Sequence, residues 1–217
     1  MTAPEIRYCL LADGGSDRAL RHPIRWLLES LGAIEAGSQW ADLRFLPAPA
    51  RDLAARIVAT TTHYEFDILF VHRDAEREPY STRLAEVEAA AHDLPNLRFV
   101  PVVPVRAMEA WLLHDEQAIR RAAGNPNGTL PLDLPRISDL ERVLDPKARL
   151  EQALKNALPH RPRERARVRT NFGVMRNRVA ELADYAALAL LPAFAALRER
   201  LSLALATVGV AQSPPTA

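Results

Sequence analysis

The chain has 217 residues, 48% hydrophobic and 25% charged, a composition typical of one folded domain with or without an extension. Its net charge of +1 excludes a general attraction for polyanions, so nucleic-acid binding would need a local basic patch. The single cysteine, Cys9, excludes a disulfide within the chain and fits a reducing, cytoplasmic setting. We expect no signal peptide and no membrane-spanning segment, because the apolar stretches are too short.

The first half of the chain alternates predicted strands and helices. Apolar runs predict strands at residues 6–12, 43–46, 68–71 and 97–105. Capped or amphipathic segments predict helices at residues 16–31, 52–62, 81–91 and 108–121. Pro101 and Pro104 indicate an edge position, or a bent exit, for the last strand. This alternation predicts an α/β fold with a parallel or mixed sheet flanked by helices.

The second half predicts a helical extension. Residues 124–135 are rich in Gly, Pro and Asn, which is typical of a loop. Helices are expected at residues 138–143, 146–158 and 174–206, with the apolar stretch 185–197 as a packed core helix. Residues 212–217 have no core-forming content and are expected to be disordered. The expected organisation is an α/β core over 1–123, an extension packed on it over 124–211, and the tail.

Carboxylates follow three of the predicted strands. Residues 13–17 (Asp-Gly-Gly-Ser-Asp) follow the first strand, Asp74 and Glu76 follow the third, and Glu109 comes soon after the fourth. The carboxyl ends of parallel strands are where α/β proteins bind ligands. Converging carboxylates repel each other unless a cation lies between them, and oxygen ligands favour Mg²⁺ or Mn²⁺. A metal-dependent phosphate chemistry is therefore the leading hypothesis.

The first of these turns also has structural explanations. Asp13 is a common turn residue before glycines. Gly14 and Gly15 either let the backbone approach a phosphate or metal, or simply form a tight turn. Asp17 either extends the acidic cluster or stabilises the first turn of a helix. His72 either binds a metal or orients a ligand, or it is structural.

Other candidates have similar alternatives. Glu76 lies in a charged run that a solvated surface would also explain. Glu109 begins a predicted helix, where a carboxylate is favoured in any case. Trp111 is more typical of a core residue than of a stacking platform.

The densest positive segment has Glu164 as its one acid and contains Arg161, Arg163, Arg165, Arg167 and Arg169, followed by Arg176 and Arg178. Such a run can neutralise nucleic-acid phosphates and favours polymeric DNA or RNA over a small nucleotide. The alternative is a surface loop in a chain where arginine greatly outnumbers lysine. Phe172 is the one aromatic residue in this segment, so base stacking there is poorly supported.

The order of these motifs resembles the Toprim fold, an α/β domain shared by topoisomerases, primases, recombination proteins and OLD-type nucleases. That family places an acidic residue and a glycine after the first strand, and Asp-x-Asp after a later strand. Residues 13–17 and 74–76 occupy the corresponding positions. Residues 109–113 resemble the Glu-x-Trp block of uncharacterised Toprim-like bacterial proteins, some of which have relatives among phage-defence and mobile-element genes. The resemblance covers most of residues 5–120.

The resemblance implies that Asp74 and Glu76 are the principal ligands of Mg²⁺ or Mn²⁺. Asp13 would be a third acid, as a ligand or a general base, and Glu109 would face the cluster. The implied activity is Mg²⁺-dependent phosphodiester cleavage of DNA or RNA, with an ATPase or other defence protein as a partner. Asp13 and Glu76 replace the usual glutamate and aspartate, which leaves a non-catalytic binding or regulatory module open. A third possibility is a metal-dependent phosphatase or phosphotransferase acting on small nucleotides.

Overall fold

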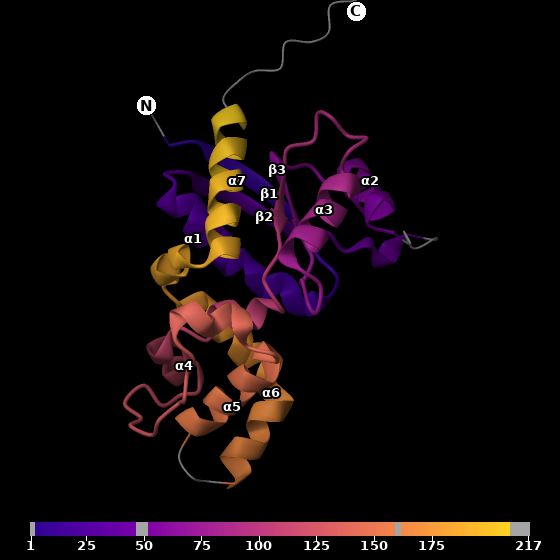
Figure 1. Cartoon of the computed structure of the whole chain (residues 1–217). Coiled ribbons are helices and arrows are strands. Elements are labelled where there is room, and N and C mark those ends of the chain that lie inside the picture. Colours follow the sequence, from indigo (N-terminus) through magenta and orange to yellow (C-terminus); the bar gives the residue numbers. More distant parts are fainter. Residues whose placement is uncertain (1–2, 47–51, 159–161, 209–217) are drawn as a thin grey trace, which may run out of the picture.

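The computed structural model describes residues 3–46, 52–158 and 162–208 (Figure 1). Four strands form one all-parallel sheet in the order β2-β1-β3-β4. They are β1 (Glu5–Leu11), β2 (Ile34–Trp40), β3 (Ile68–His72) and β4 (Phe99–Val102). The predicted α/β fold class is confirmed. In the described ranges, no helix combines the length and the apolar character needed to cross a membrane.

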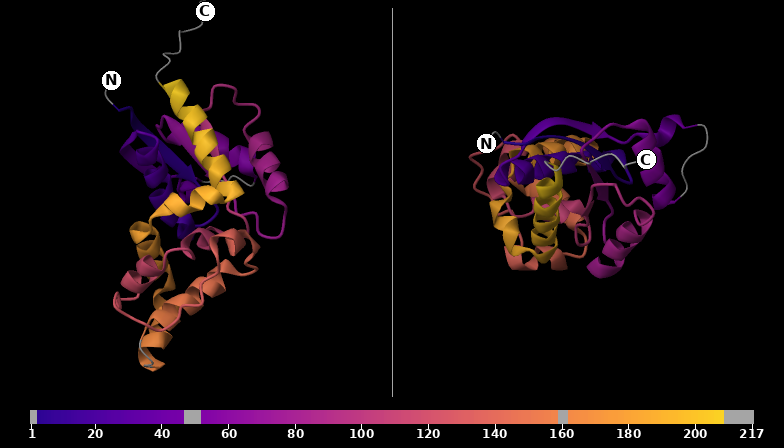
Figure 2. Two further views of the ribbon diagram at one scale, coloured as in Figure 1. Left: turned by 60° about the vertical axis from the view of Figure 1, so that its left-hand side comes forward. Right: turned by 90° about the horizontal axis from the view of Figure 1, so that it is seen from above.

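Helices cover both faces of the sheet. Successive residues of a strand point to opposite faces, and here both faces carry apolar side chains that need to be covered. On one face Tyr8, Leu10 and Phe70 pack with α1 (Arg21–Ser30) and α7 (Pro192–Val208). The opposite face carries a second apolar cluster, which includes side chains from α2 (Leu53–His63) and α3 (Tyr80–Ala90). Figure 2 shows α7, in yellow, running along the sheet. Arg200 of α7 pairs with Glu88 of α3 at 2.8 Å. The central strand β3 is buried along its whole length.

The prediction of a strand at residues 43–46 is wrong. Residues Leu43–Phe45 form a 3-10 turn, η2, where the Asp42 side chain accepts a hydrogen bond from the Arg44 N–H. The second strand is instead β2, at residues 34–40, which the sequence did not reveal because its residues are mostly polar or small. An edge strand is defined by its backbone pairing with one neighbour, here β1, rather than by a continuous apolar run.

The position of β4 agrees with its prolines. It lies at the other edge of the sheet and pairs only with β3. Pro101 lies within the strand. Because no strand pairs with the outer side of β4, a proline, which has no N–H, is tolerated there. Pro104 follows the strand, and its carbonyl accepts a hydrogen bond from the Ala75 N–H at 3.0 Å.

Two predicted helices are each divided. The segment expected to be helical over 16–31 forms a 3-10 turn, η1 (Gly15–Leu20), followed by α1. The segment 108–121 forms η3 (Met108–Leu112) and then α4 (Glu116–Ala122), which begins where the Asp115 side chain accepts a hydrogen bond from the Ala118 N–H. These breaks matter for function, because both 3-10 turns carry acidic residues at the carboxyl edge of the sheet.

The extension is helical, as predicted, and residues 124–135 form no helix or strand. Its elements are η4 (Ile137–Arg142), α5 (Pro146–Ala157), α6 (Pro162–Leu182), η5 (Tyr185–Leu190) and α7. A continuous helix over 174–206 is therefore wrong, and the stretch 185–197 is split between η5 and α7. The Asp184 side chain accepts a hydrogen bond from the Ala186 N–H at the start of η5, and Pro192 begins α7. The expected tail, 212–217, lies outside the described residues.

In Figure 1, α4, α5 and α6 lie below the sheet, and α7 returns upward to its face. One apolar cluster runs from the sheet into these helices, so the extension and the α/β part share a core. Aromatic contacts strengthen this junction. Phe194 of α7 meets Trp111 edge-on at a centroid distance of 5.1 Å and stacks on Tyr185 at 6.3 Å. All three side chains are almost fully buried.

We expect Phe194→Ala to lower the free energy of unfolding by about 3–5 kcal/mol, because it leaves a cavity where three aromatic rings meet. The measurement is urea denaturation followed by circular dichroism. Leu203→Ala on the same helix is the control, since Leu203 is 65% exposed, and its effect should stay below about 1 kcal/mol. Equal small effects of the two substitutions would contradict the packing of α7 described here.

Candidate functional site

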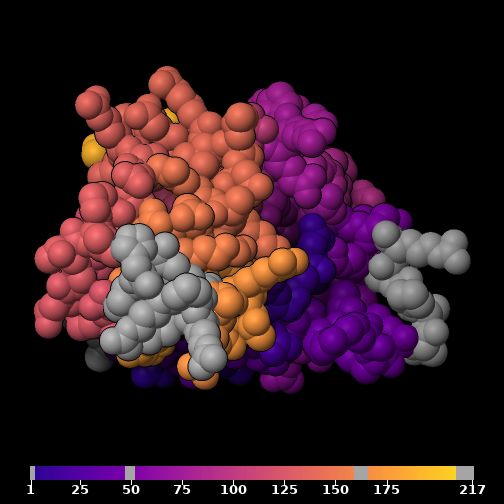
Figure 3. Space-filling model, turned by 90° about the horizontal axis from the view of Figure 1, so that it is seen from below, coloured from indigo at the N-terminus to yellow at the C-terminus, as the bar shows by residue number. Residues whose placement is uncertain are grey.

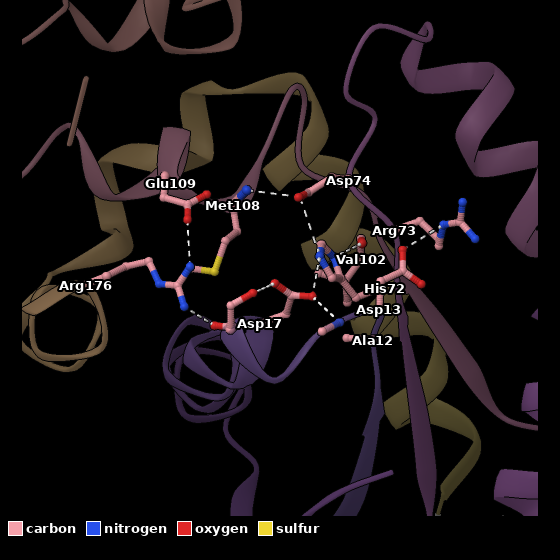
Figure 4. A network of polar contacts seen from close by, with 12 residues as sticks. Ala12, Asp13, Asp17, His72, Arg73, Asp74, Val102, Met108, Glu109 and Arg176 are labelled. Atoms are coloured by element: carbon pink, nitrogen blue, oxygen red, sulfur yellow. Dashed lines mark hydrogen bonds and ion pairs between the residues drawn. The ribbon is translucent and has the colours of Figure 1, made fainter. Parts of the chain in front are cut away.

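Four polar side chains gather beyond the carboxyl ends of β1 and β3 (Figure 4). They are Asp17 from η1, His72 at the end of β3, Asp74 from the following turn, and Glu109 from η3. The chain leaves β1 toward β2 on one side and returns to β3 on the other, so this edge is the topological switch point of the sheet. Ligands of open parallel sheets bind in the crevice at such a point.

His72 is buried, and its two ring nitrogens have different roles. Nδ1 lies 2.9 Å from the carbonyl oxygen of Val102, which only accepts hydrogen bonds, so the hydrogen is on Nδ1. Nε2 faces Asp74 Oδ1 at 3.5 Å and Asp17 Oδ2 at 3.9 Å. Burial lowers the pKa of His72 and outweighs the nearby carboxylates, so the ring is neutral at pH 7. Nε2 therefore presents a lone pair to two carboxyl groups.

Asp74 is the most perturbed acid of the group. Burial, followed by the charges of Glu109 and Asp17, raises the pKa of its carboxyl to about 8, against a smaller opposing effect of the Met108 N–H. That N–H donates to Asp74 Oδ1 at 3.1 Å. At neutral pH the isolated protein thus holds a proton on Asp74, next to the lone pair of His72. A bound cation would replace this proton.

Asp17 serves both purposes that the sequence left open. Its Oδ2 accepts a hydrogen bond from the Gly14 N–H at 3.0 Å, and its Oδ1 accepts one from the Ser16 hydroxyl at 2.9 Å. These contacts brace the turn after β1. The same Oδ2 faces His72, and Asp17 is only 9% exposed.

Glu109 is held by a residue of the extension. Arg176 of α6 donates from Nη1 to Glu109 Oε1 at 2.8 Å, and both side chains are almost completely buried. Arg176 Nη2 also donates to the carbonyl oxygen of Ser16. This pair neutralises the Glu109 carboxylate, so Asp17 and Asp74 are the two carboxyl groups of the cluster that have no arginine partner among the described residues. Sequence reasoning placed Arg176 in a surface run, because no local pattern predicts a contact 67 positions away.

Asp13 lies apart from this cluster. Its carboxylate is half exposed and contacts two guanidinium groups, Arg56 Nη1 at 2.7 Å and Arg73 Nε at 3.2 Å. Arg73 also contacts Glu86 at 3.3 Å. The negative charge of Asp13 is therefore balanced by two arginines, and its carboxylate is not directed to the same position as that of Asp74.

Glu76 is exposed, in a left-handed backbone conformation with a φ of 53°. Its N–H donates to the Arg106 carbonyl at 3.0 Å, and Arg106 Nη1 donates back to the Glu76 carbonyl at 3.1 Å. Arg106 also has a positive φ, of 69°. The turn after β3 is thus fastened to the turn after β4. Glu76 adds a small negative contribution at Asp74, and its side chain is a peripheral member of the site.

The side chains of Asp17, His72 and Asp74 are of types that bind a hard divalent cation, but their present positions do not form a complete metal site. Carboxylate oxygens and one imidazole lone pair are ligands that Mg²⁺ or Mn²⁺ accepts. Burial, and then the charges of Glu109 and Asp17, raise the pKa of Asp74 there. Within the described ranges, however, no three His, Cys, Asp or Glu side chains are arranged to hold a metal ion as they stand. Asp17, His72 and Asp74 fit in chemical type and would have to move closer together.

The remaining predicted residues are placed as follows. Gly14 and Gly15 lie in the turn above the site, and a Cβ added to Gly15 would meet nothing within 4 Å, so the space there is open. Arg161 lies outside the described residues. Arg163 and Arg165 belong to α6, but their side chains lie outside the described part. Arg167 and Arg169 are exposed on α6, while Trp111 is a core residue.

Comparison of the chain with protein-family models, with curated proteins and with solved structures finds no match. Its class is therefore defined by its own geometry. It is an α/β protein with a four-stranded parallel sheet and an acidic site at the carboxyl edge of that sheet.

We expect Arg176→Met to lower the free energy of unfolding by about 3–5 kcal/mol, because it leaves the Glu109 carboxylate buried without its partner. Urea denaturation checks this value. Arg178→Met is the matched control, since Arg178 is half exposed and its pair with Glu181 is a surface pair. That substitution should change stability by less than about 1 kcal/mol. A similar small change for both variants would show that the buried ion pair is absent.

We also expect Asp74 to make stability depend on pH between about 4 and 8. Its pKa is about 8 in the folded protein and lower, at about 3.9, in the unfolded chain. The folded state therefore binds the extra proton, and stability falls as pH rises toward 8, by up to about 1.4 kcal/mol per pH unit. Above pH 8 the loss levels off.

Urea denaturation at several pH values should show a flatter profile for Asp74→Asn than for the unmodified protein. Between about pH 6.5 and 8 His72 does not obscure the comparison, because its lowered pKa affects stability only below about pH 6.5. Asp139→Asn, at an exposed surface pair, should keep the profile of the unmodified protein. An unchanged profile in Asp74→Asn would refute the raised pKa.

Proposed function

We propose that this chain is a Toprim-like, metal-dependent phosphodiesterase that cleaves nucleic acid at the carboxylate cluster. The observation that carries the proposal is the geometry at the switch point of the parallel sheet. Three carboxyl groups, those of Asp17, Asp74 and Glu109, gather there at His72, and within the described residues Glu109 alone of the three pairs with an arginine. A divalent cation between Asp74, Asp17 and His72 would relieve this imbalance.

In this proposal Asp74 is the central metal ligand, with Asp17 and His72 beside it. The bound ion would activate water and stabilise charge on the phosphoryl oxygens. Glu109 is oriented by its contact with Arg176. Asp13 and Glu76 lie at the rim, where Asp13 can act as a further acid once a substrate phosphate engages its arginines.

Two features support nucleic acid as the substrate. The order of the acidic motifs follows the Toprim pattern, and the all-parallel sheet agrees with it at the level of fold class. Arg167 and Arg169 are exposed cations on α6, the same helix that supplies Arg176 to the site. Phosphates bound along α6 would therefore continue toward the cluster. A role in phage defence or in a mobile element, with an ATPase as a partner, belongs to this proposal through the resemblance.

A second candidate is a non-catalytic binding or regulatory module. The observation in its favour is that Asp13 is already compensated by Arg56 and Arg73, and that Glu76 is exposed. In that case the acidic site would have lost part of its metal set and would bind a partner or a strand without cleaving it.

The test is cleavage of single- and double-stranded DNA and RNA with Mg²⁺ or Mn²⁺, together with thermal unfolding at each metal concentration. We expect metal-dependent cleavage that Asp74→Asn lowers by about 100-fold or more, since losing a direct ligand should exceed the roughly 10–100-fold effect of losing an outer partner. Asp139→Asn is the control and should keep full activity.

The metal should also raise the melting temperature of the unmodified protein but not that of Asp74→Asn. Metal stabilisation without cleavage would favour a small nucleotide as substrate or the need for a partner protein. No cleavage and no metal response would leave the non-catalytic module as the function.

A further inference from the structure

Next to the acidic site, Arg18 and Trp40 form a pair that separates two hollows. Trp40 is the last residue of the edge strand β2, and the guanidinium carbon of Arg18 lies 5.3 Å from the centre of its ring. Each hollow is bordered by both residues, with volumes of about 260 Å³ and 270 Å³. The first is lined further by Tyr8, Leu10, Arg21 and Ser38; the second by Gly14, Gly15, Arg44 and Arg56.

Arg18 is exposed and contacts the Trp40 ring, but its charge is not paired with a carboxylate in the described part of the chain. The other two arginines of the second hollow do have partners: Arg44 pairs with Asp42, and Arg56 pairs with Asp13. Arg18 thus offers a guanidinium for an incoming anion, and it rests on an aromatic face that becomes available when it moves.

The position of the pair links it to the site. Arg18 follows Asp17 in η1, and the two side chains go to different places: Asp17 faces His72, whereas Arg18 covers Trp40. Asp13 lines the second hollow as well, together with the open backbone at Gly15. A ligand in this hollow would therefore lie beside the turn that carries the acids.

We infer that Trp40 and Arg18 form a subsite for one unpaired nucleotide of a single-stranded nucleic acid, next to the phosphodiester bond to be cleaved. The base stacks on Trp40, and the adjoining phosphate meets Arg18 and the open backbone at Gly15. This inference rests on the proposed function for the identity of the bond, but its binding contacts are independent of cleavage.

Size and chemistry favour this ligand. Each hollow is slightly smaller than the roughly 300 Å³ at which small-molecule sites begin, which suits one nucleotide and not a base pair. A base within a duplex has both faces covered by its neighbours, whereas an unpaired base can leave the stack. An aromatic face beside an arginine is the arrangement that binds unpaired bases without strong sequence preference.

The experiment measures binding of a fluorescein-labelled oligothymidylate by anisotropy, in EDTA, to the full chain carrying Asp74→Asn. An abasic oligonucleotide of the same length carries the same charge and lacks the bases. We expect the thymidylate to bind at least about 5-fold more tightly than the abasic strand, the factor that corresponds to roughly 1 kcal/mol of base stacking. Trp40→Leu should remove this difference, and Trp40→Phe should keep part of it.

Arg18→Ala should weaken binding of both strands. Its matched control is Arg25→Ala, which removes the same charge from α1 at a half-exposed side chain that lines neither hollow. Thermal unfolding identifies any variant that does not fold. Since Arg18 is exposed, its substitution tests the subsite even if a variant of Trp40 is unstable.

Equal affinity for thymidylate and abasic strands, or a difference that survives in Trp40→Leu, would overturn the inference. Equal affinity for a duplex would also overturn it. Thymidine monophosphate as tightly bound as the oligonucleotide would assign the subsite to free nucleotides and overturn the strand assignment. Because EDTA and Asp74→Asn exclude metal-dependent cleavage, these results do not depend on whether the proposed nuclease activity is found.

Discussion

The contact between Arg176 and Glu109 is the interaction on which the site depends. It joins α6 of the extension to η3 at the carboxyl edge of the sheet, and the same arginine donates to the Ser16 carbonyl in η1. One side chain therefore ties together the turns that carry Asp17 and Glu109. Because the pair is buried, it could not be replaced by water, and separating its members would leave an unpaired charge in the interior.

The pair also sets the charge of the cluster. With Glu109 paired, Asp17 and Asp74 remain opposite the lone pair of His72. Burial, followed by the charges of Glu109 and Asp17, raises the pKa of Asp74 to about 8. A proton and a divalent cation compete for the same position in such a site. This competition explains how the acids can be buried together without metal and still offer a place for one.

The 3-10 turn η1 has two functional sides. Asp17 points to the cluster, and its neighbour Arg18 points to Trp40. The same turn places Gly14 and Gly15 beside the second hollow. The turn thereby connects a place for metal chemistry with a place for a nucleotide. The proposed catalytic and binding steps share this one segment of the chain.

Several features could be predicted from the sequence because they depend on neighbours along the chain. The buried strands β1 and β3 are apolar runs, and the proline-containing strand β4 lies at an edge. The acids that follow these strands form short motifs that the sequence alone displays. The edge strand β2 was not predicted, because its residues are mostly polar or small and it is a strand only through its backbone pairing with β1.

The composition of the site could be predicted only in part. Asp74 and Glu109 were predicted as site residues and both lie in the cluster, whereas Asp13 pairs with arginines and Glu76 faces solvent. Asp17 had an equally good structural explanation, a structural role was the more common explanation for His72, and Arg176 had no local signal at all.

What the sequence by itself determined is the α/β class and the acidic edge, because strand periodicity and turn chemistry are local. Which acids meet, what compensates them, and which arginine stays available to a ligand were decided by the tertiary structure. Those choices depend on contacts between residues as many as 160 positions apart, for which the chain has no periodic pattern.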